Sequence, residues 1–487
     1  MSGPETGQRW QALALLCLGA FMIVIDMTIV NVALPSIGAD LGFADASLVW
    51  VVNAYLLTFG GCLLLGGRLG DLYGQRRVFL IGLAFFTLTS LVCGLARSQG
   101  LLVTARAVQG IGGAIVDSVS LSLIVSLFTA PAERAKAMGV YGFVCAGGGS
   151  VGVLAGGLLT SQLDWHWIFL VNAPIGAAVF VLCWKLLPAD ADVQRSGRLD
   201  VAGAVTITAA LMLAVYAVIG GNEAGWLSLR TLGLLAVAAA MLLAFVAIES
   251  RVAAPLVPLR LFRLPNIVTA NIVGVLWSAG MFAWFFISAL YLQLVLGYSA
   301  MEVGLAFLPS NLVMAALSLG ASAWLVGRYG LRVPLAGGLA LAALGLALFA
   351  RAPVDGRYLT DVLPGMLLLG IGAGIAFNPL LLAAMSDVSE DESGLASGVV
   401  NTAFMMGGAL GLAVLASFAA SRTADLQGAG AALPAALAAG YSLAFWIGAA
   451  CALGGAILGA FSLRQRADAP RMAASTAAAT GIGSTAP

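Results

Sequence analysis

The chain has 487 residues, of which 61% are hydrophobic and 9% are charged, and its formal net charge is +1. Polar residues are too few to cover a soluble globule of this length, so the composition predicts an integral membrane protein. With almost no net charge and no basic patch, the chain offers no surface for a nucleic acid, and we expect none as a partner.

Fourteen apolar runs are long enough to cross the hydrocarbon core of a membrane, which takes about 20 residues of helix. An even number of crossings puts both termini on the same side. We expect membrane-spanning helices near residues 12–35, 47–66, 78–97, 101–127, 137–160, 166–187, 200–220, 229–249, 267–291, 301–326, 333–350, 360–385, 394–419 and 438–462.

The order of these helices predicts two six-helix lobes, at residues 11–190 and 261–463, with two inserted helices between them at 191–260. Residues 1–10 form an N-terminal segment, and residues 464–487, rich in Ala, Ser and Thr, are expected to be disordered. The loop GRLGDLYGQRR at 67–77 is echoed by GRYGLRV at 327–333, at the equivalent place in the second lobe. Parallel repeats of this kind are typical of secondary transporters, whose substrate site lies between the lobes.

The loops also predict an orientation. With the N-terminus in the cytoplasm, seventeen Lys and Arg residues fall on the cytoplasmic side and five on the outside, which are Arg97, Arg230, Arg351, Arg357 and Arg422. This strong positive-inside bias predicts a multi-pass protein of a bacterial inner membrane with both termini in the cytoplasm.

The first apolar run contains Asp26, a carboxylate in the middle of a membrane helix. On insertion scales such a charge costs about 2.5–3.5 kcal/mol, so an acid at this place indicates a functional site. We expect Asp26 to carry the proton of a coupled transporter or to recognise a cationic substrate. The alternative is a buried acid that hydroxyl or backbone groups satisfy.

The loop at 67–77 combines glycines, which permit a tight turn and close helix approach, with charges that can pair at a helix end. We interpret it as a latch that breaks when the lobes rock. A basic loop that only fixes orientation is the alternative, and the two are compatible. The predicted latch residues are Gly67, Arg68, Asp71, Gly74, Arg76 and Arg77.

The fourth predicted helix carries Arg106 and Asp117. Helix direction places Arg106 at or outside the midplane, like Asp26, and Asp117 deeper towards the cytoplasm. Eleven residues, about 16 Å of helix, separate the two, so they cannot pair directly. Arg106 stays charged and cannot carry protons, but close to Asp26 it would favour proton release; its alternative role is a structural clamp. Asp117 is a second proton site, an anchor for a cation, or a residue paired with Ser118, Ser120 or another polar neighbour.

The fifth predicted helix is rich in glycine, and small residues four apart let a neighbouring backbone approach closely. We expect Gly148, Gly152, Gly156 and Gly157 to provide such a contact, with simple packing as the alternative.

Aromatic residues and scattered amides predict a substrate cavity. An aromatic wall with few fixed charges suits large, flat, hydrophobic molecules, although helix packing and lipid contact are alternative roles for each aromatic residue. The candidate residues are Asn31, Asn53, Tyr55, Gln109, Trp277, Trp284, Phe285, Asn311, Asn378 and Phe404.

Several classes of protein are excluded by what the sequence lacks. It has no GxxxxGK[ST] motif for nucleotide, a single His, and cysteines without ligand spacing. We therefore expect no enzyme and no cofactor.

Five motifs together resemble one known family. GRLGDLYGQRR resembles the signature loop of the major facilitator superfamily, and IDMTIVNVALPSI at 25–37 resembles the first-helix motif of its fourteen-helix drug:proton antiporters. ARAVQGIGGA at 105–114, GVLAGGLLT at 152–160 and DWHWIFLVNAPIG at 164–176 follow in the family's order. The chain departs from the family pattern at Val153, where the antiporter motif has Pro, and at Asp117, where an apolar residue is usual. Phe404 and Met405 replace a common Arg-Gln pair.

The resemblance implies a monomeric exporter that exchanges hydrophobic, cationic drugs or toxic compounds for protons by alternating access. One alternative is an exporter of a lipid or of a specific secondary metabolite. Another is a membrane sensor that keeps the fold without transporting.

Overall fold

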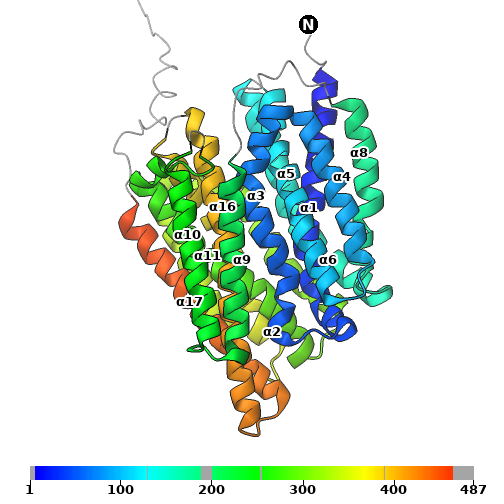
Figure 1. Ribbon diagram of the computed structural model, residues 1–487, viewed down its shortest axis with the longest axis vertical. Helices are drawn as coiled ribbons and strands as arrows, with labels where there is room; N and C mark the ends of the chain where they lie inside the picture. Colours follow the sequence, from blue (N-terminus) through cyan, green and yellow to red (C-terminus); the bar gives the residue numbers. More distant parts are fainter. Residues whose placement is uncertain (1–5, 129, 188–199, 253–254, 389, 464–487) are drawn as a thin grey trace, which may run out of the picture.

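The computed structural model describes residues 6–128, 130–187, 200–252, 255–388 and 390–463. These residues form a bundle of long helices that run roughly side by side (Figure 1). Within them no strand occurs, which confirms the predicted all-α class. We call the end of the bundle where the first helix begins the terminal end, and the other the opposite end. The predicted disordered tail at 464–487 lies outside the described residues.

The first lobe comprises six long helices and two short ones near the opposite end. Its elements are α1 (Thr6–Leu41), α2 (Asp45–Leu48), α3 (Trp50–Tyr73), α4 (Gln75–Gly94), α5 (Gln99–Leu127), α6 (Pro131–Gln162), α7 (Trp167–Leu170) and α8 (Asn172–Leu186). The inserted pair follows as α9 (Val201–Ala224) and α10 (Leu229–Glu249). The predicted boundary at residue 190 lies outside the described residues.

The second lobe begins with the short helix η1 (Leu259–Arg263) and contains three π-helical turns. Its other elements are α11 (Pro265–Leu290), η2 (Tyr291–Val295), α12 (Ala300–Ala316), η3 (Leu317–Ala321), α13 (Ser322–Tyr329), α14 (Arg332–Phe349), η4 (Tyr358–Val362), α15 (Leu363–Met385), α16 (Glu390–Gly428) and α17 (Leu433–Ser462).

Thirteen spans within the described residues are long and apolar enough to cross a membrane. The remaining predicted span, 301–326, is divided: α12 is a shorter apolar helix, and the π turn η3 joins it to α13. Helices suit this environment because lipid offers no partner for backbone polar groups, which must bond within the segment. A capping box begins α12, where Glu302 N–H donates to Ser299 Oγ and Ser299 N–H donates to Glu302 Oε2.

The two lobes meet mainly along two helix pairs, α3 with α16 and α6 with α12, and α1 also contacts α11. Asn53 Nδ2 donates to the Ala409 carbonyl at 2.9 Å, and Gln293 Nε2 donates to the Val32 carbonyl at 3.0 Å. Asn53, Val32 and Gln293 lie towards the opposite end of their helices. The lobes are therefore tied together by buried or partly buried amide hydrogen bonds at that end.

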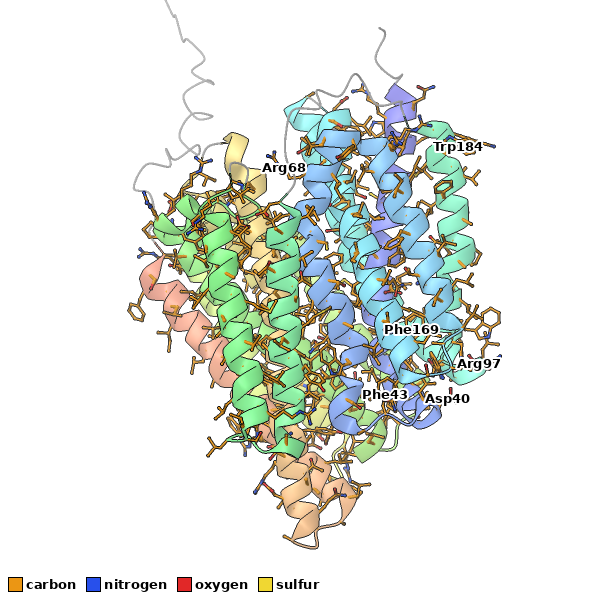
Figure 2. The ribbon with its side chains drawn as sticks, viewed as in Figure 1. Asp40, Phe43, Arg68, Arg97, Phe169 and Trp184 are labelled. Atoms are coloured by element: carbon orange, nitrogen blue, oxygen red, sulfur yellow. The ribbon has the colours of Figure 1, made fainter. Side chains whose placement is uncertain are left out.

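One side of α6 is exposed near the terminal end. Val140 and Phe143 are 38% and 59% exposed, and a Cβ built at Gly139 or Gly142 would meet no atom within 4 Å. Figure 2 places Arg68 and Trp184 at this end of the bundle and Asp40, Phe43 and Arg97 at the other. The packing of other helices against α6 is therefore uneven along its length.

The inserted pair lies beside the seam between the lobes, with α9 against both α3 and α16 (Figure 1). Asn222 Nδ2 donates to the Ser417 carbonyl at 2.8 Å, and the Ser417 hydroxyl donates to the Val218 carbonyl at 3.2 Å. Gly61 of α3 faces Thr208 so closely that a Cβ would overlap its hydroxyl. The pair therefore covers the α3–α16 contact from the side.

Candidate functional site

Asp26 lies in the interior of the first lobe, with none of its surface exposed. Arg106 Nη1 is 2.5 Å from Asp26 Oδ2, which makes a buried ion pair between α1 and α5. The other carboxylate oxygen accepts from Gln109 Nε2 at 2.9 Å and from Asn172 Nδ2 at 3.0 Å. Two amides and a guanidinium therefore satisfy the carboxylate; the predicted alternative of hydroxyl or backbone partners is wrong.

Arg106 is held by four further contacts. Its Nε donates to the Val51 carbonyl on α3 at 3.0 Å, and its Nη1 also donates to Gln109 Oε1 at 2.8 Å. Its guanidinium lies 4.3 Å from the centre of the Tyr55 ring and 5.5 Å from that of Phe169. Cation–π contacts of this kind stabilise a desolvated cation.

Asn172 extends the network to α4 and α8. Its Nδ2 donates to the Ser90 hydroxyl at 3.0 Å, and that hydroxyl donates to the Phe169 carbonyl at 2.9 Å. Asn172 and Ser90 are 1% and 0% exposed. Sequence reasoning missed both as functional residues, although a polar residue inside an apolar run is the signal that identified Asp26. Six helices, α1, α3, α4, α5, α7 and α8, thus supply one connected network.

The energetics of this pair follow from its burial. Each ion loses hydration worth several kcal/mol, which mutual attraction and the added hydrogen bonds must offset. Protonation of Asp26 would leave Arg106 as a buried cation without its counter-ion, so the two charges cannot be altered independently. A proton on Asp26 therefore favours a different position of Arg106.

Asp117 lies on α5 three turns further towards the terminal end and is partly exposed. Its Oδ1 accepts from the Tyr141 hydroxyl of α6 at 3.0 Å. The predicted partners Ser118 and Ser120 instead donate to backbone carbonyls of their own helix, at 2.8 and 2.6 Å. Asp117 thus has a polar neighbour, but on another helix.

The predicted latch forms the turn between α3 and α4. Gly74 has φ +97°, a conformation that favours glycine, and its N–H donates to the Gly70 carbonyl at 3.0 Å. Arg68 and Asp71 are exposed and within electrostatic range of each other, and Asp71 also bonds to Gln75.

Two details of the latch prediction change. The close approach to α5 comes from Gly66, where a Cβ would lie 2.6 Å from Ser118 Oγ; at Gly67 the nearest atom would be 4.0 Å away. Arg76 donates to the Trp184 carbonyl of α8, so this contact stays within the first lobe. Arg77 is exposed at the start of α4. Gating by these residues remains a prediction.

The four predicted packing glycines all face another helix. A Cβ at Gly148 would lie 3.1 Å from Val24, one at Gly152 would overlap Thr28 Oγ1, and one at Gly156 would lie 2.6 Å from the Ile29 carbonyl, all on α1. Gly157 faces the other lobe, where a Cβ would lie 2.6 Å from the Ala300 carbonyl. The glycines thus bring α6 close to α1 and close to the start of α12.

The first-lobe residues predicted to line a substrate cavity are buried in protein contacts. Tyr55 and Gln109 belong to the Asp26 network, and Asn53 forms the hydrogen bond to α16. Asn31 is 7% exposed and donates to carbonyls of its own helix at 3.4 Å. Their contact with substrate remains a prediction.

The second-lobe candidates gather into two aromatic clusters. Trp277 and Phe404 have ring centres 5.4 Å apart and share Phe377 as a neighbour. Trp284 and Phe285, 4.5 Å apart, pack on Phe307 at 5.5 and 5.7 Å. These clusters join α11 to α15, α16 and α12.

Polar atoms beside these clusters lack partners. Trp284 Nε1 and Asn311 Nδ2 are buried donors for which the described residues supply no acceptor. Asn378 Nδ2, in contrast, donates to the Ser318 carbonyl at 2.8 Å. A buried donor left unpaired costs about 1–3 kcal/mol, so a bound acceptor group would be favourable there.

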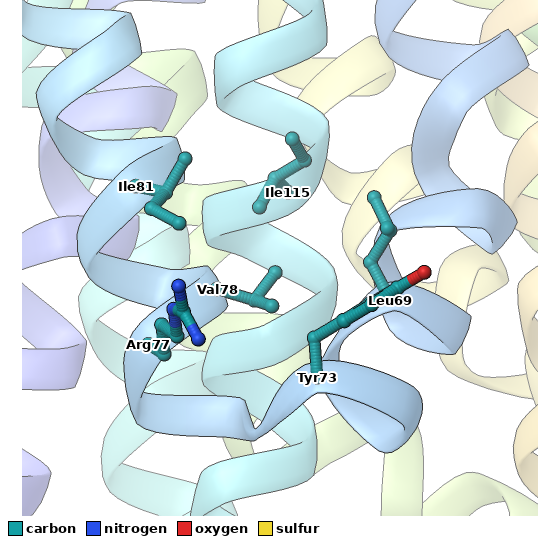
Figure 3. Close-up of a pocket in the computed structure, with 6 residues that line it drawn as sticks. All are labelled: Leu69, Tyr73, Arg77, Val78, Ile81 and Ile115. Atoms are coloured by element: carbon teal, nitrogen blue, oxygen red, sulfur yellow. The ribbon is translucent and has the colours of Figure 1, made fainter. Parts of the chain in front are cut away.

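Two surface grooves are formed by the described residues. One, about 430 Å³, lies between the terminal ends of α3 and α4 with Ile115 of α5 at its floor (Figure 3). Figure 3 shows Tyr73 and Arg77 on its two walls. The second, about 200 Å³, lies between α11, α16 and α17. Neither is lined by Asp26, Asp117 or the predicted cavity residues.

Two lobes of membrane-spanning helices that pack along a common seam, with a buried ion pair inside one of them, define a two-lobed secondary transporter. Residues 16–412 match the family model of the Major Facilitator Superfamily, and the chain belongs to that family. The resemblance drawn from the motifs is confirmed.

Relatives in two organisms agree with this assignment. The chain is 42% identical over 430 residues to the puromycin resistance protein pur8 of Streptomyces alboniger, across 87% of this chain and 84% of that protein. It is 42% identical over 445 residues to the cephamycin export protein CmcT of Amycolatopsis lactamdurans, across 91% and 90%. The protein is therefore a transporter and not an enzyme.

Solved structures show the same fold. A bacterial homologue of the human lysosomal transporter Spinster, in an inward-facing and unoccupied conformation, aligns with a TM-score of 0.66 at 16% identity, over 96% of this chain and all of that chain. At this identity the likeness concerns the fold alone.

Proposed function

We propose that this transporter exports hydrophobic, cationic drugs or toxic compounds in exchange for protons, with Asp26 as the coupling acid. The observation that carries the proposal is the fully buried Asp26–Arg106 pair. A membrane protein gains nothing in stability from such a pair over apolar packing, so its presence calls for a functional reason. The names of the relatives, a puromycin resistance protein and a cephamycin export protein, support drug export.

The coupling mechanism rests on charge balance inside the lobe. With Asp26 ionised, Arg106 bridges α1, α3 and α5. A proton on Asp26 removes the counter-charge, and Arg106 then moves towards other acceptors or water, which loosens its bond to α3. Release of the proton restores the pair. Each proton that moves inward is driven by about 2.3 kcal/mol per 100 mV of membrane potential.

We place both termini in the cytoplasm of a bacterial cell, with the protein in the inner membrane as a monomer. The distribution of Lys and Arg supports this orientation, because it puts seventeen on the cytoplasmic side and five on the outside. The terminal end then faces the cytoplasm. Contact of Gly157 with Ala300 closes the outer end of the seam between α6 and α12, while a Cβ at Gly139 or Gly142, near the inner end of α6, would meet no atom within 4 Å. This arrangement matches an inward-facing state.

The chemistry of the substrate is proposed from polar groups that have no complete set of protein partners. Asp117 is partly exposed and has one oxygen without a described hydrogen bond, so it can attract a cation. The unpaired donors of Trp284 and Asn311, beside aromatic rings, suit a flat molecule with hydrogen-bond acceptors. Among the predicted cavity residues, Asn31 and those of the second lobe are retained as the candidates for this contact, whereas Asn53, Tyr55 and Gln109 are engaged in buried protein contacts.

Proteoliposomes with an internal pH dye and an imposed pH gradient test the proposal. Adding a lipophilic cation to wild type is expected to trigger proton movement, Asp26→Asn is expected to abolish it, and Asp117→Asn is expected to weaken substrate affinity. Asp40→Asn is the matched control, because this acid accepts from Trp165 at the edge of the lobe, away from Arg106. Absence of proton movement with folded wild-type protein, for every cation tried, would refute antiport of such compounds.

A specific secondary metabolite is the second candidate, because one relative is named for export of a single antibiotic, cephamycin. Export of that kind predicts that one β-lactam-like or other self-made compound triggers proton movement while lipophilic cations do not. The same vesicles, loaded in parallel with both kinds of compound, separate the two candidates.

A further inference from the structure

The Asp26 network is not exposed at the protein surface, yet a coupling acid must pass its proton on. Asp26, Arg106 and Gln109 are 0%, 1% and 0% exposed. Both carboxylate oxygens already accept hydrogen bonds from side chains that do not carry protons onward, namely a guanidinium and two amides. A route from Asp26 to the cytoplasmic side therefore needs another titratable or hydroxyl group inside the lobe.

The Tyr55 hydroxyl is the buried group in the right place. Tyr55 is 0% exposed, and its hydroxyl has no hydrogen-bond partner among the described residues. Its ring lies against Arg106 at 4.3 Å, and its hydroxyl is within electrostatic range of Asp26, Arg106 and Asp117. A buried hydroxyl without a partner is costly, so a functional reason for it is expected.

Gly113 provides the space that this hydroxyl occupies. A Cβ built at Gly113 would lie 2.5 Å from Tyr55 Oη, so any side chain there would displace the ring. Gly113 lies on one face of α5 with Arg106, Gln109 and Asp117, at spacings of three, four and four residues. The hydroxyl consequently sits about halfway along this face between the two acids.

The spacing fits proton transfer through water. Four residues of helix separate Gly113 from Gln109 and again from Asp117, which is about 6 Å along the axis on each side. Two successive O–H···O hydrogen bonds through one water molecule span about 5.5 Å. The axial spacing on each side of Gly113 is therefore comparable to the reach of one bridging water.

We propose that Tyr55 relays the coupling proton from Asp26 to Asp117, which releases it to the cytoplasmic side. Protonated Asp26 gives its proton through water to Tyr55 Oη, while the Tyr55 O–H gives its own proton through a second water to the Asp117 carboxylate. Asp26 returns to its ionised form beside Arg106, Asp117 becomes the acid, and Tyr55 is unchanged. The relay rests on the proposed antiport.

Other polar groups near the route are engaged elsewhere. The Cys93 thiol donates to Gln109 Oε1 at 3.5 Å, on the Asp26 side of Tyr55. Ser120 and Thr58 donate to carbonyls of their own helices. The neighbour stacked on Tyr55 at 5.7 Å is Phe59, which carries no proton. Tyr141 bonds Asp117 on the side of α6 and lies beyond the acid.

Tyr55→Phe tests the relay because it keeps the ring and its contact with Arg106 while removing the hydroxyl. In proteoliposomes we expect substrate-triggered proton flux to fall at least tenfold. Substrate affinity and proton-independent substrate exchange should stay within twofold of wild type. Tyr291→Phe is the matched control and should keep flux within threefold, because it removes a tyrosine hydroxyl that donates to the Pro353 carbonyl in the second lobe, away from the route.

Gly113→Ala is the second variant, since its methyl group displaces the hydroxyl without removing it, and we expect the same selective loss of flux. Normal proton flux in Tyr55→Phe would overturn the relay, as would an equal loss of proton flux and of substrate exchange in both variants. The antiport proposal would survive either result as long as wild type shows substrate-triggered proton flux. Absence of flux in wild type would instead refute the antiport, and the relay with it.

Discussion

Removing one member of the Asp26–Arg106 pair should destabilise the protein far more than removing both. Arg106→Gln leaves a carboxylate with none of its surface exposed beside only two amide donors. Breaking a buried pair in this way costs about 3–5 kcal/mol, because the remaining charge has no counter-ion. Asp26→Asn should cost a similar amount, since it leaves Arg106 buried with its bond to Val51 and its two aromatic neighbours.

The double variant Asp26→Asn/Arg106→Gln removes both charges and should recover most of that loss, so the two single effects are not additive. Reversible unfolding of the purified protein in mixed micelles, followed by tryptophan fluorescence, gives the free energy of unfolding for the four proteins. An interaction energy below about 0.5 kcal/mol between the two substitutions would refute a strong buried pair. Thr89→Ala, on the lipid side of α4, is a control with a side-chain bond to its own helix only.

Three further predictions concern contacts away from the pair. Gly157→Ala should open the outer end of the seam between α6 and α12, seen as faster labelling of an outer-end cysteine, whereas Gly149→Ala, with open space beside it, should not. Asn53→Ala removes a buried hydrogen bond between the lobes and should lower the free energy of unfolding by about 1 kcal/mol, read from the same unfolding curves. Glu249→Gln should raise thermal stability at neutral pH, because Glu249 contacts the Asp200 carboxyl group with no basic partner among the described residues; a lower midpoint would contradict this.

Much of the fold followed from the sequence because apolar runs of membrane length have few alternatives in lipid. The exception at 301–326 has a physical cause: the π turn at 317–321 changes the helical register without changing the hydropathy of the run. Hydropathy indicates whether a segment can cross the membrane, but it does not indicate whether the helix contains a π turn.

The site was predicted in part. Asp26 and Arg106 stood out because charges are costly in lipid, and helix direction gave them similar depth. Asn172 was missed and Gln109 was assigned to the substrate cavity, because amides cost less to bury and these two lie on helices whose rotation the sequence does not specify. The same uncertainty of rotation explains why Tyr55 and Gln109, assigned to a cavity wall, lie in the interior of the lobe.

The bonds of Arg106 suggest how protonation reaches the contact between the lobes. Arg106 Nε holds the carbonyl of Val51, and two residues further along α3 Asn53 donates to Ala409 of the second lobe. Loss of the first bond would free the end of α3 that makes the second. Asp26→Asn mimics the protonated acid and should therefore increase the movement of α3 relative to α16. Faster disulfide trapping between cysteines placed on the two helices would measure this movement. Unchanged trapping in Asp26→Asn would show that proton binding and the movement of the lobes are linked by another path.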